Sequence, residues 1–206
     1  MTNEETYKEL LKFLNTLHYV KPEQIPEIAL YMDQVTGFME DRLKKVKRYP
    51  NDKILTKTMI NNYTKAKILP PPIKKKYSKE HMYMLLLIYY YKGILSLDDL
   101  NTVLFNLTNN YFKPDDEDAE FNVEAIYREV FTLETEQMSA LKKDIAQKFE
   151  HSKSTFIDGP SHNLSDAERD RLQKFAFICE LGFDVYLKKL LMEKLCDQLK
   201  EEQKGV

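Results

Sequence analysis

The sequence has few of the residues that make tight turns, and it has no long apolar run. Five glycines and eight prolines in 206 residues are too few for a β-sandwich or barrel, which needs a turn every ten residues or so. The longest apolar run, Met82 to Tyr91, would span about 15 Å as a helix, roughly half of a bilayer core. We therefore expect a helical protein with no membrane-spanning segment.

Signals of secretion, metal binding and catalysis are also missing. The N-terminal segment MTNEETYKEL has no basic stretch followed by an apolar one, so it does not resemble a secretory signal. The four histidines follow no metal-ligand spacing, and the chain has no glycine-rich phosphate loop, nucleophile elbow, HExxH or CxxC motif. These absences predict a cytoplasmic protein that is not an enzyme and holds no metal or cofactor.

The two cysteines, Cys179 and Cys196, lie in one predicted helical segment. A helix of that length separates them by about 25 Å, which is far beyond the reach of a disulfide. We expect both to be core thiols in a reducing compartment.

Apolar residues spaced three and four positions apart predict an all-α fold. We expect helices over residues 4–17, 28–46, 57–66, 79–92, from 97 onward, over 119–151 with a break near Thr132, and over 165–202. The stripe of the second helix consists of Ile28, Met32, Val35, Met39, Leu43 and Val46. Candidate N-caps are Thr2, Thr56, Ser78, Ser96 and Ser165. The acidic run Pro114–Asp118 is the best linker candidate.

The net charge of −2 conceals an uneven distribution of charge along the chain. From Arg42 to Lys79, thirteen basic residues stand against one acid, Asp52, so this block carries +12 and the rest of the chain −14. A basic block flanked by acidic segments favours a polyanion site on a protein that elsewhere repels polyanions. Lysine-rich segments also occur on idle surfaces, so charge alone leaves both interpretations open.

A short predicted helix within this block has one apolar and one polar side. Ile60 and Tyr63 would point inward, while Lys57, Asn61 and Lys65 form an outward stripe with Thr58 and Asn62 beside it. Asparagine can make bidentate contacts to adenine, and lysine can contact guanine or phosphate. The same stripe would also suit a solvated helix face, which is the alternative interpretation.

The run Leu55–Pro72, LTKTMINNYTKAKILPPP, resembles the recognition helix and exit of the MerR-type winged helix-turn-helix regulators. In that family a Val/Leu-Ser/Thr start leads to Thr-Ile-Arg-Tyr-Tyr and then Gly-Leu-Leu-Pro. Tyr77–His81 is similar to the junction between wing and next helix, and Ile94–Leu100 is similar to the family's Gly-Phe-Ser-Leu-Glu-Glu-Ile segment. The pattern LTKTMINNYTK…LPPP…KKYSKEH resembles more closely a bacterial family of unknown function thought to be related to these regulators. The resemblance covers about residues 28–108.

This resemblance implies a sequence-specific DNA-binding transcription regulator whose recognition helix, about 57–66, enters the major groove of double-stranded DNA. It also implies a wing reduced to Ile73–Tyr77. Lys67 stands where the family has a glycine with positive φ, which predicts a weaker end to the helix. With the basic run that follows the preceding helix, the assigned DNA-binding residues are Thr56, Lys57, Thr58, Asn61, Asn62, Lys65, Lys74, Lys75, Lys76, Tyr77, Lys44, Lys45, Lys47 and Arg48.

The chain is thus predicted to have an N-terminal helix (1–22), a helix-turn-helix domain (23–113) and a C-terminal helical bundle (114–206). Apolar residues of the bundle, from Phe175 to Leu199, would supply an internal core and part of a homodimer seam, because helix-turn-helix proteins commonly read two half-sites as a two-fold pair. No residue marks a small-molecule effector pocket. The alternative function is a non-catalytic protein–protein adaptor in which Lys74–Lys76 meet an acidic partner.

Overall fold

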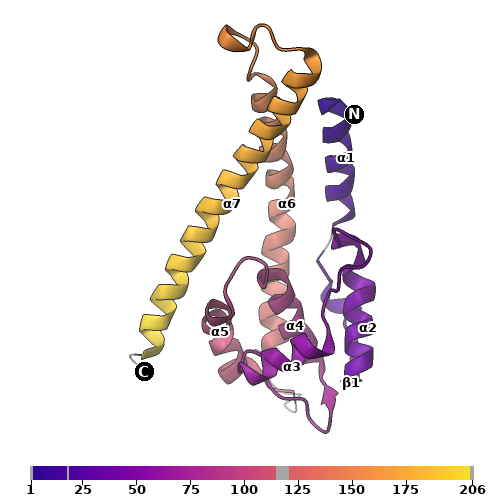
Figure 1. The fold of residues 1–206 in the computed structure, drawn as a ribbon. Helices are drawn as coiled ribbons and strands as arrows, with labels where there is room; N and C mark the ends of the chain where they lie inside the picture. The colour runs from indigo at the N-terminus through magenta and orange to yellow at the C-terminus, as the bar shows by residue number, and fades with distance from the viewer. Residues whose placement is uncertain (1, 18, 115–120, 205–206) are drawn as a thin grey trace. The chain divides into compact units, whose positions relative to one another are not determined.

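The computed structural model describes residues 2–17, 19–114 and 121–204, which form seven α-helices and one pair of short strands (Figure 1). The helices are α1 (Asn3–Thr16), α2 (Met32–Leu43), α3 (Lys57–Lys65), α4 (Lys79–Tyr91), α5 (Leu97–Asn106), α6 (Val123–Lys153) and α7 (Asp166–Lys204). The antiparallel strands are β1 (Leu30–Tyr31) and β2 (Lys76–Tyr77). Single 3-10 turns occur at Pro22–Gln24, Lys44–Val46 and Gly159–Ser161, and a π-helical turn occurs at Leu107–Tyr111. The fold is therefore predominantly helical, as expected.

The chain divides into two compact units, which differ from the three predicted parts. The first unit consists of residues 1–18 and 133–191, and the second of residues 19–132 and 192–206. The N-terminal helix α1 is not a separate part, because it packs in the first unit with segments of α6 and α7. The second unit contains the predicted helix-turn-helix region together with the end of α7.

The core of the second unit is centred on α4. Every residue from His81 to Ile88 is buried, as the nearly all-round apolar pattern of this helix predicts. Around it lie buried side chains from α2, α3 and α5: Val35, Met39, Leu43, Ile60, Tyr63, Leu100 and Leu104. This core fixes which faces of α2 and α3 remain at the surface.

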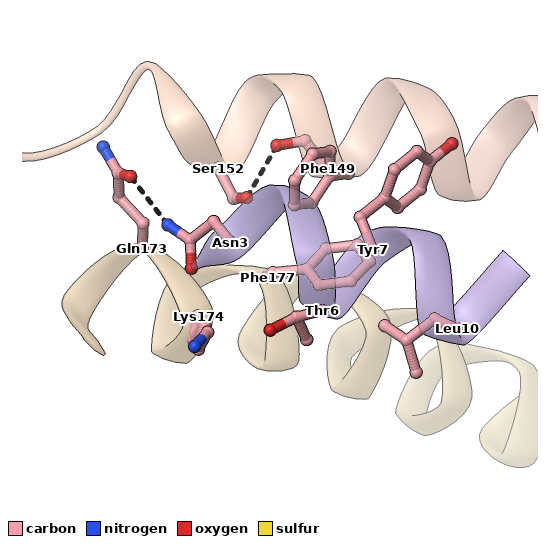
Figure 2. Close-up of a pocket in the computed structure, with 9 residues that line it drawn as sticks. All are labelled: Asn3, Thr6, Tyr7, Leu10, Phe149, Ser152, Gln173, Lys174 and Phe177. Atoms are coloured by element: carbon pink, nitrogen blue, oxygen red, sulfur yellow. Dashed lines mark hydrogen bonds between the residues drawn. The ribbon is translucent and has the colours of Figure 1, made fainter. Parts of the chain in front are cut away.

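The first unit brings α1 against the end of α6 and the first half of α7 (Figure 2). The ring of Tyr7 stacks on Phe149 with 4.2 Å between centroids, and Phe177 meets Phe149 edge-on at 5.7 Å. Asn3 donates from Nδ2 to Gln173 Oε1 over 3.0 Å. The cavity that these residues line has a volume of about 10 Å³, which is room for one water at most. This cavity is too small for an effector.

Several predicted helix starts are confirmed by hydrogen bonds. Thr2 and Glu5 form a reciprocal capping box at the start of α1. Ser96 Oγ accepts from Asp99 N at 3.1 Å at the start of α5, and Ser165 with Glu168 forms the box before α7. These caps depend on side chains three residues apart, which is why they can be recognised in the sequence.

The helix expected over residues 28–46 is shorter than predicted. Residues Leu30 and Tyr31 pair with β2, so α2 begins only at Met32. Ile28 is 70% exposed and Val46 is 40% exposed, whereas the middle of the predicted stripe is buried. The strand replaces the helix because its backbone bonds go to a segment far along the chain, which local periodicity does not reveal.

The second half of the chain differs from expectation in helix α6 and in one of its two cysteines. Helix α6 is continuous, without the expected break near Thr132. Cys196 is buried as expected, but Cys179 is exposed and is not a core thiol. The expected acidic linker lies outside the described residues except for Pro114.

The end of α3 has a complete Schellman motif although a lysine occupies the glycine position. Ile68 N donates to Tyr63 O at 3.0 Å, and Lys67 N donates to Thr64 O at 3.1 Å. Lys67 adopts φ 61°, the left-handed conformation that disfavours any residue with a Cβ. The hydrogen bonds of the cap are therefore complete. The weakness expected at the end of this helix takes the form of backbone strain at Lys67.

We predict that Lys67→Gly raises the free energy of unfolding by about 1 kcal/mol, because glycine adopts positive φ without strain. Urea denaturation of the two proteins measures this difference. The control is Lys65→Gly, in a residue with helical geometry, which should lower stability by up to about 1 kcal/mol. A loss of stability in Lys67→Gly would contradict the assignment of strain.

Candidate nucleic-acid interface

Helix α3 presents one polar face to solvent. Thr56 caps it, with its Oγ1 accepting from Met59 N at 3.2 Å. Ile60 and Tyr63 are buried, as expected. The five outward residues assigned from the sequence, Lys57, Thr58, Asn61, Asn62 and Lys65, are all exposed. The assigned residues of α3 therefore share one exposed face.

The segment after the proline run is a tight β-hairpin tip. Ile73 N donates to Lys76 O at 3.0 Å, and Lys76 N donates to Ile73 O at 2.9 Å. The two residues between them, Lys74 and Lys75, have φ 48° and 66°. Two consecutive positive φ values define a type I′ hairpin turn, which normally uses Asn-Gly. Lysines at both positions cost about 1 kcal/mol or more each, and strain of this kind is concentrated at functional sites.

Strand pairing attaches this hairpin to the N-terminal end of α2. Leu30 pairs with Tyr77, and Tyr31 pairs with Lys76. The Lys76 ammonium lies 5.1 Å from the centroid of the Tyr31 ring. The hairpin and its pairing strand form a short two-stranded ribbon, called the wing from here on, whose second strand comes from residues that were predicted to be helical.

An ion pair attaches α3 to the same end of α2. Asp33, in the first turn of α2, pairs with Lys57, the first residue of α3. The start of α3 and the base of the wing therefore both lie at the N-terminal end of α2. The structure brings these two groups of assigned residues together.

The assigned basic run lies at the other end of α2. Lys44, Lys45, Lys47 and Arg48 follow its last residue, Leu43. The twelve residues of α2 span about 18 Å. The assigned site is therefore divided into two clusters, one at each end of α2, and is not one continuous patch.

Acids neutralise part of the basic block. Asp41 pairs with Lys44 at 2.8 Å, and Glu40 pairs with Lys47. A further lysine of the block, Lys79, bridges two glutamates, at 2.6 and 2.8 Å. The effective positive charge is thus lower than the sequence implies.

Cations without an acidic partner lie at the wing tip, at the end of α3 and in the basic run after α2. Within residues 2–17, 19–114 and 121–204, no acidic partner is found for Lys45, Lys65, Lys74 or Lys75. Lys74 and Lys75 stand at the hairpin tip, and Lys65 lies in the last turn of α3. These ammonium groups are available to an incoming anion without first breaking an ion pair.

Tyr77 does not belong to the surface to which it was assigned. Its side chain is 3% exposed and its ring meets His81 edge-on at 5.4 Å. Burial raises the pKa of the Tyr77 hydroxyl. The reason is the alternation of strand residues: Lys76 and its neighbour Tyr77 point to opposite faces of β2, and Tyr77 is on the inner one.

Tyr31 and Asp33 belong to the surface, although the sequence did not point to them. Tyr31 is 54% exposed beside Lys76, and Asp33 holds Lys57. Both follow from contacts between distant segments. The only sequence signal is an aromatic residue in a polar setting directly before a helix.

The buried side chain of His81 contacts the chain on both sides of the wing. Ser78 N donates to His81 Nδ1 at 3.0 Å, and Nε2 lies 3.3 Å from the carbonyl oxygen of Pro71. The ring is therefore neutral, with its proton on Nε2. Its contacts join the start of the hairpin segment to the start of α4. Burial lowers the pKa of His81 to about 4.

The described residues show neither a metal-binding cluster nor a membrane-spanning helix. They contain no group of three or more histidine, cysteine, aspartate or glutamate side chains arranged to hold a metal ion. Within the same part of the chain, no helix combines the length and apolar character needed to span a bilayer.

Comparison with known proteins identifies the family. The family described as a domain of unknown function, DUF1836, matches residues 20–130, which contain α2, the wing, α3 and all fourteen assigned DNA-binding residues. Because the match covers more than half of the chain, the protein belongs to this family. No curated protein and no solved structure matches the chain.

We predict that stability falls as the pH drops from about 6.5 to about 4. The unfolded chain binds a proton at His81 near pH 6.5, whereas the folded protein does so only near pH 4. The contribution of the neutral His81 ring to the free energy of unfolding is therefore fully present above pH 6.5. It decreases below that pH, by up to about 3 kcal/mol. Urea denaturation at a series of pH values measures the decrease.

The exposed His162 provides the control for this measurement. His162→Gln should leave the pH dependence unchanged. In contrast, nuclear magnetic resonance titration of the His81 ring in the intact protein should show a midpoint well below pH 6. A midpoint near 6.5 would refute the buried neutral ring.

Proposed function

We propose that the protein is a sequence-specific, double-stranded-DNA-binding transcription regulator with a MerR-like winged helix-turn-helix. The observation that carries the proposal is the exposed polar face of α3 beside a wing whose tip consists of two strained lysines. A solvated helix face alone would not require the neighbouring hairpin to hold two ammonium groups at a cost in stability.

Helix α3 would lie in the major groove. Its nine residues extend about 13 Å, close to the roughly 12 Å width of the groove. Asn61 and Asn62 would contact adenine, and Lys65 would contact guanine or phosphate. These side chains are exposed and belong to one helix, so they can approach neighbouring base pairs together.

The wing and the basic run would contact the backbone. Lys74 and Lys75 project from the hairpin tip next to the start of α2, and Lys45 and Arg48 follow its far end. A separation of about 18 Å along α2 lets the two clusters reach phosphates on opposite sides of one groove. Such contacts set the register of the protein on the duplex.

The proposal places the protein in the cytoplasm, where DNA and a reducing environment are both present, and it assigns no catalytic step. The alternative is an adaptor that uses the same lysines on an acidic protein. Glu40 and Asp41 neutralise two lysines of the basic run, so the wing is the basic surface on which both alternatives rely. An experiment that separates the two alternatives must therefore use DNA itself.

We predict that the purified protein binds unrelated duplex DNA and loses affinity steeply with salt. Neutralising about six phosphates lowers affinity by about a thousandfold between about 50 and 200 mM salt. Fluorescence anisotropy measures the slope. Lys75→Ala should weaken binding to every duplex and reduce the slope by about one, because one phosphate contact is lost.

Asn61→Ala separates base reading from backbone contact in the same experiment. It should relax the sequence preference, measured on a selected duplex against a random one, while leaving the salt slope unchanged. Absence of duplex binding at low salt would reject the regulator and leave the adaptor.

We also predict that Asp33→Asn increases affinity for random duplex. Removing this carboxylate releases Lys57 and removes a negative charge near the phosphates, which is worth about 1 kcal/mol, or about fivefold, at low salt. Glu9→Gln on α1 makes the same change in net charge in the other unit and should have little effect. Equal behaviour of the two variants would show that Asp33 does not face DNA.

A further inference from the structure

A hollow of about 280 Å³ lies beside the wing in the second unit. We call it the wing hollow, and the residues that line it are Ala29, Ile73, Lys74, Lys76, Ser78 and Pro114. It adjoins a second hollow of about 440 Å³, since Ala29, Ser78 and Pro114 line both. Sites for small molecules commonly have volumes of about 300–1,000 Å³. The two hollows together therefore have room for a small organic molecule.

The lining of the wing hollow is partly apolar. Ala29, Ile73 and Pro114 have no polar group in their side chains, and the side chain of Ile73 is 44% exposed. Covering exposed apolar surface with an apolar group of a ligand removes it from water, which is favourable. The wing hollow thus suits a ligand with an apolar body better than a bare ion.

The charge of the wing hollow comes from Lys74 and Lys76. Within the part of the chain that the structure describes, neither lysine has an acidic partner, and the Lys76 ammonium lies near the ring of Tyr31. Lysine is a common ligand of phosphate groups in proteins. A phosphate monoester carries close to two negative charges at neutral pH, which two ammonium groups can balance. The pair of lysines therefore favours a phosphate over a singly charged group.

The hydroxyl of Ser78, the other polar side chain of the wing hollow, is already used. Its Oγ lies 2.9 Å from Nδ1 of His81, the ring nitrogen that carries no proton. The hydroxyl therefore donates to His81 and has no second hydrogen for an anion. Attraction for an anion in the wing hollow depends on the two lysines.

Carboxylates make the second hollow less suitable for a phosphate. Its charged lining residues are Glu27, Lys79, Glu80, Lys113 and Glu124. The ammonium of Lys79 is held by two of these glutamates, at 2.6 and 2.8 Å. Acids exceed bases in this hollow, so a phosphate is repelled there relative to the wing hollow. This difference orients a ligand that carries its charge at one end.

We infer that the wing hollow binds the phosphate monoester of a small apolar or aromatic molecule. The phosphate lies beside Lys74 and Lys76, and the apolar body covers Ile73 and extends toward the second hollow. Binding of this ligand does not depend on DNA. It also involves Ala29 and Pro114, which have no part in the proposed DNA interface.

Titration of the full chain with phenyl phosphate, followed by nuclear magnetic resonance of the backbone amides, tests the inference. We expect saturable shifts at Ala29, Ile73 and Ser78. Covering roughly 60 Å² of apolar surface corresponds to about tenfold in affinity, so phenyl phosphate should bind about ten times more tightly than inorganic phosphate. Equal affinities, no saturation, or shifts confined to α3 and the basic run after α2 overturn the inference.

Benzoate separates the contribution of the phosphate from that of the ring. It has the same ring but one negative charge, so it should bind about fivefold more weakly than phenyl phosphate, because one lysine then lacks a partner. Binding of benzoate with equal or higher affinity would overturn the assignment of a phosphate.

The charge of the site is tested with Lys74→Asn. Asparagine suits the positive φ of this turn position, so the hairpin is retained while one ammonium group is removed, and phenyl phosphate should bind about fivefold more weakly. Lys53→Asn makes the same change in charge at an exposed residue of the second unit that does not line the wing hollow. It should bind as the wild type does. Equal affinities of the two variants contradict the role of Lys74.

The space in the wing hollow is tested with Ala29→Leu. Ala29 is exposed, so the larger side chain should fill the hollow without a change in the unfolding transition, and the affinity for phenyl phosphate should fall about tenfold or more. Ala167→Leu makes the same change at an exposed residue of the first unit and should have no effect. Unchanged affinity in Ala29→Leu would show that the ligand binds elsewhere.

A consequence for DNA binding rests on the proposed function, because Lys74 belongs to both sites. Saturating phenyl phosphate should lower the affinity of the wild type for duplex DNA about fivefold, relative to the same concentration of inorganic phosphate, and should not affect Ala29→Leu. An unchanged duplex affinity refutes the shared use of Lys74. Absence of duplex binding without ligand refutes the proposed function alone, since the amide titration measures ligand binding without DNA.

Discussion

Two residue pairs, Leu30 with Tyr77 and Tyr31 with Lys76, join the wing to the start of α2. This short ladder determines much of the candidate interface. It sends Tyr77 into the core, leaves Lys76 outside, and places the hairpin tip at the end of α2 where Asp33 also meets Lys57. His81 supports the ladder from beneath through Ser78 and Pro71. The basic surface therefore depends on a small buried arrangement of neutral groups.

Acids on α2 shape the electrostatics of that surface. Asp33, Glu40 and Asp41 each hold one lysine, so the lysines that remain available include those of the wing tip, Lys65 at the end of α3 and Lys45 after α2. A surface with every cation unpaired would bind any polyanion strongly. Pairing part of them lowers the attraction of this surface for polyanions in general.

The features predicted correctly from the sequence are local ones. The cap at Thr56, the inward Ile60 and Tyr63, and the burial of α4 follow from spacings within a few residues. The features that sequence reasoning missed are non-local. Strand β1 was predicted as helix because its partner lies far along the chain, and Asp33 was overlooked because its lysine belongs to another helix.

The side of a short strand on which a residue lies was equally hidden, which is why Tyr77 was placed on the wrong face. Exposed apolar residues of α7, among them Phe175, Phe183 and Leu191, illustrate the reverse difficulty. Their pattern is visible in the sequence, but the sequence does not tell whether the same chain or another one covers them.

The turn at Lys74 and Lys75 has a consequence for protein engineering. Both residues occupy backbone conformations that suit asparagine and glycine, so a programme that selects only for thermal stability would replace them. The variants obtained would melt later and retain the hairpin, yet they would carry two fewer positive charges at its tip. At these two positions, resistance to heat and attraction for polyanions are therefore opposed. Selection for the first alone would reduce the second.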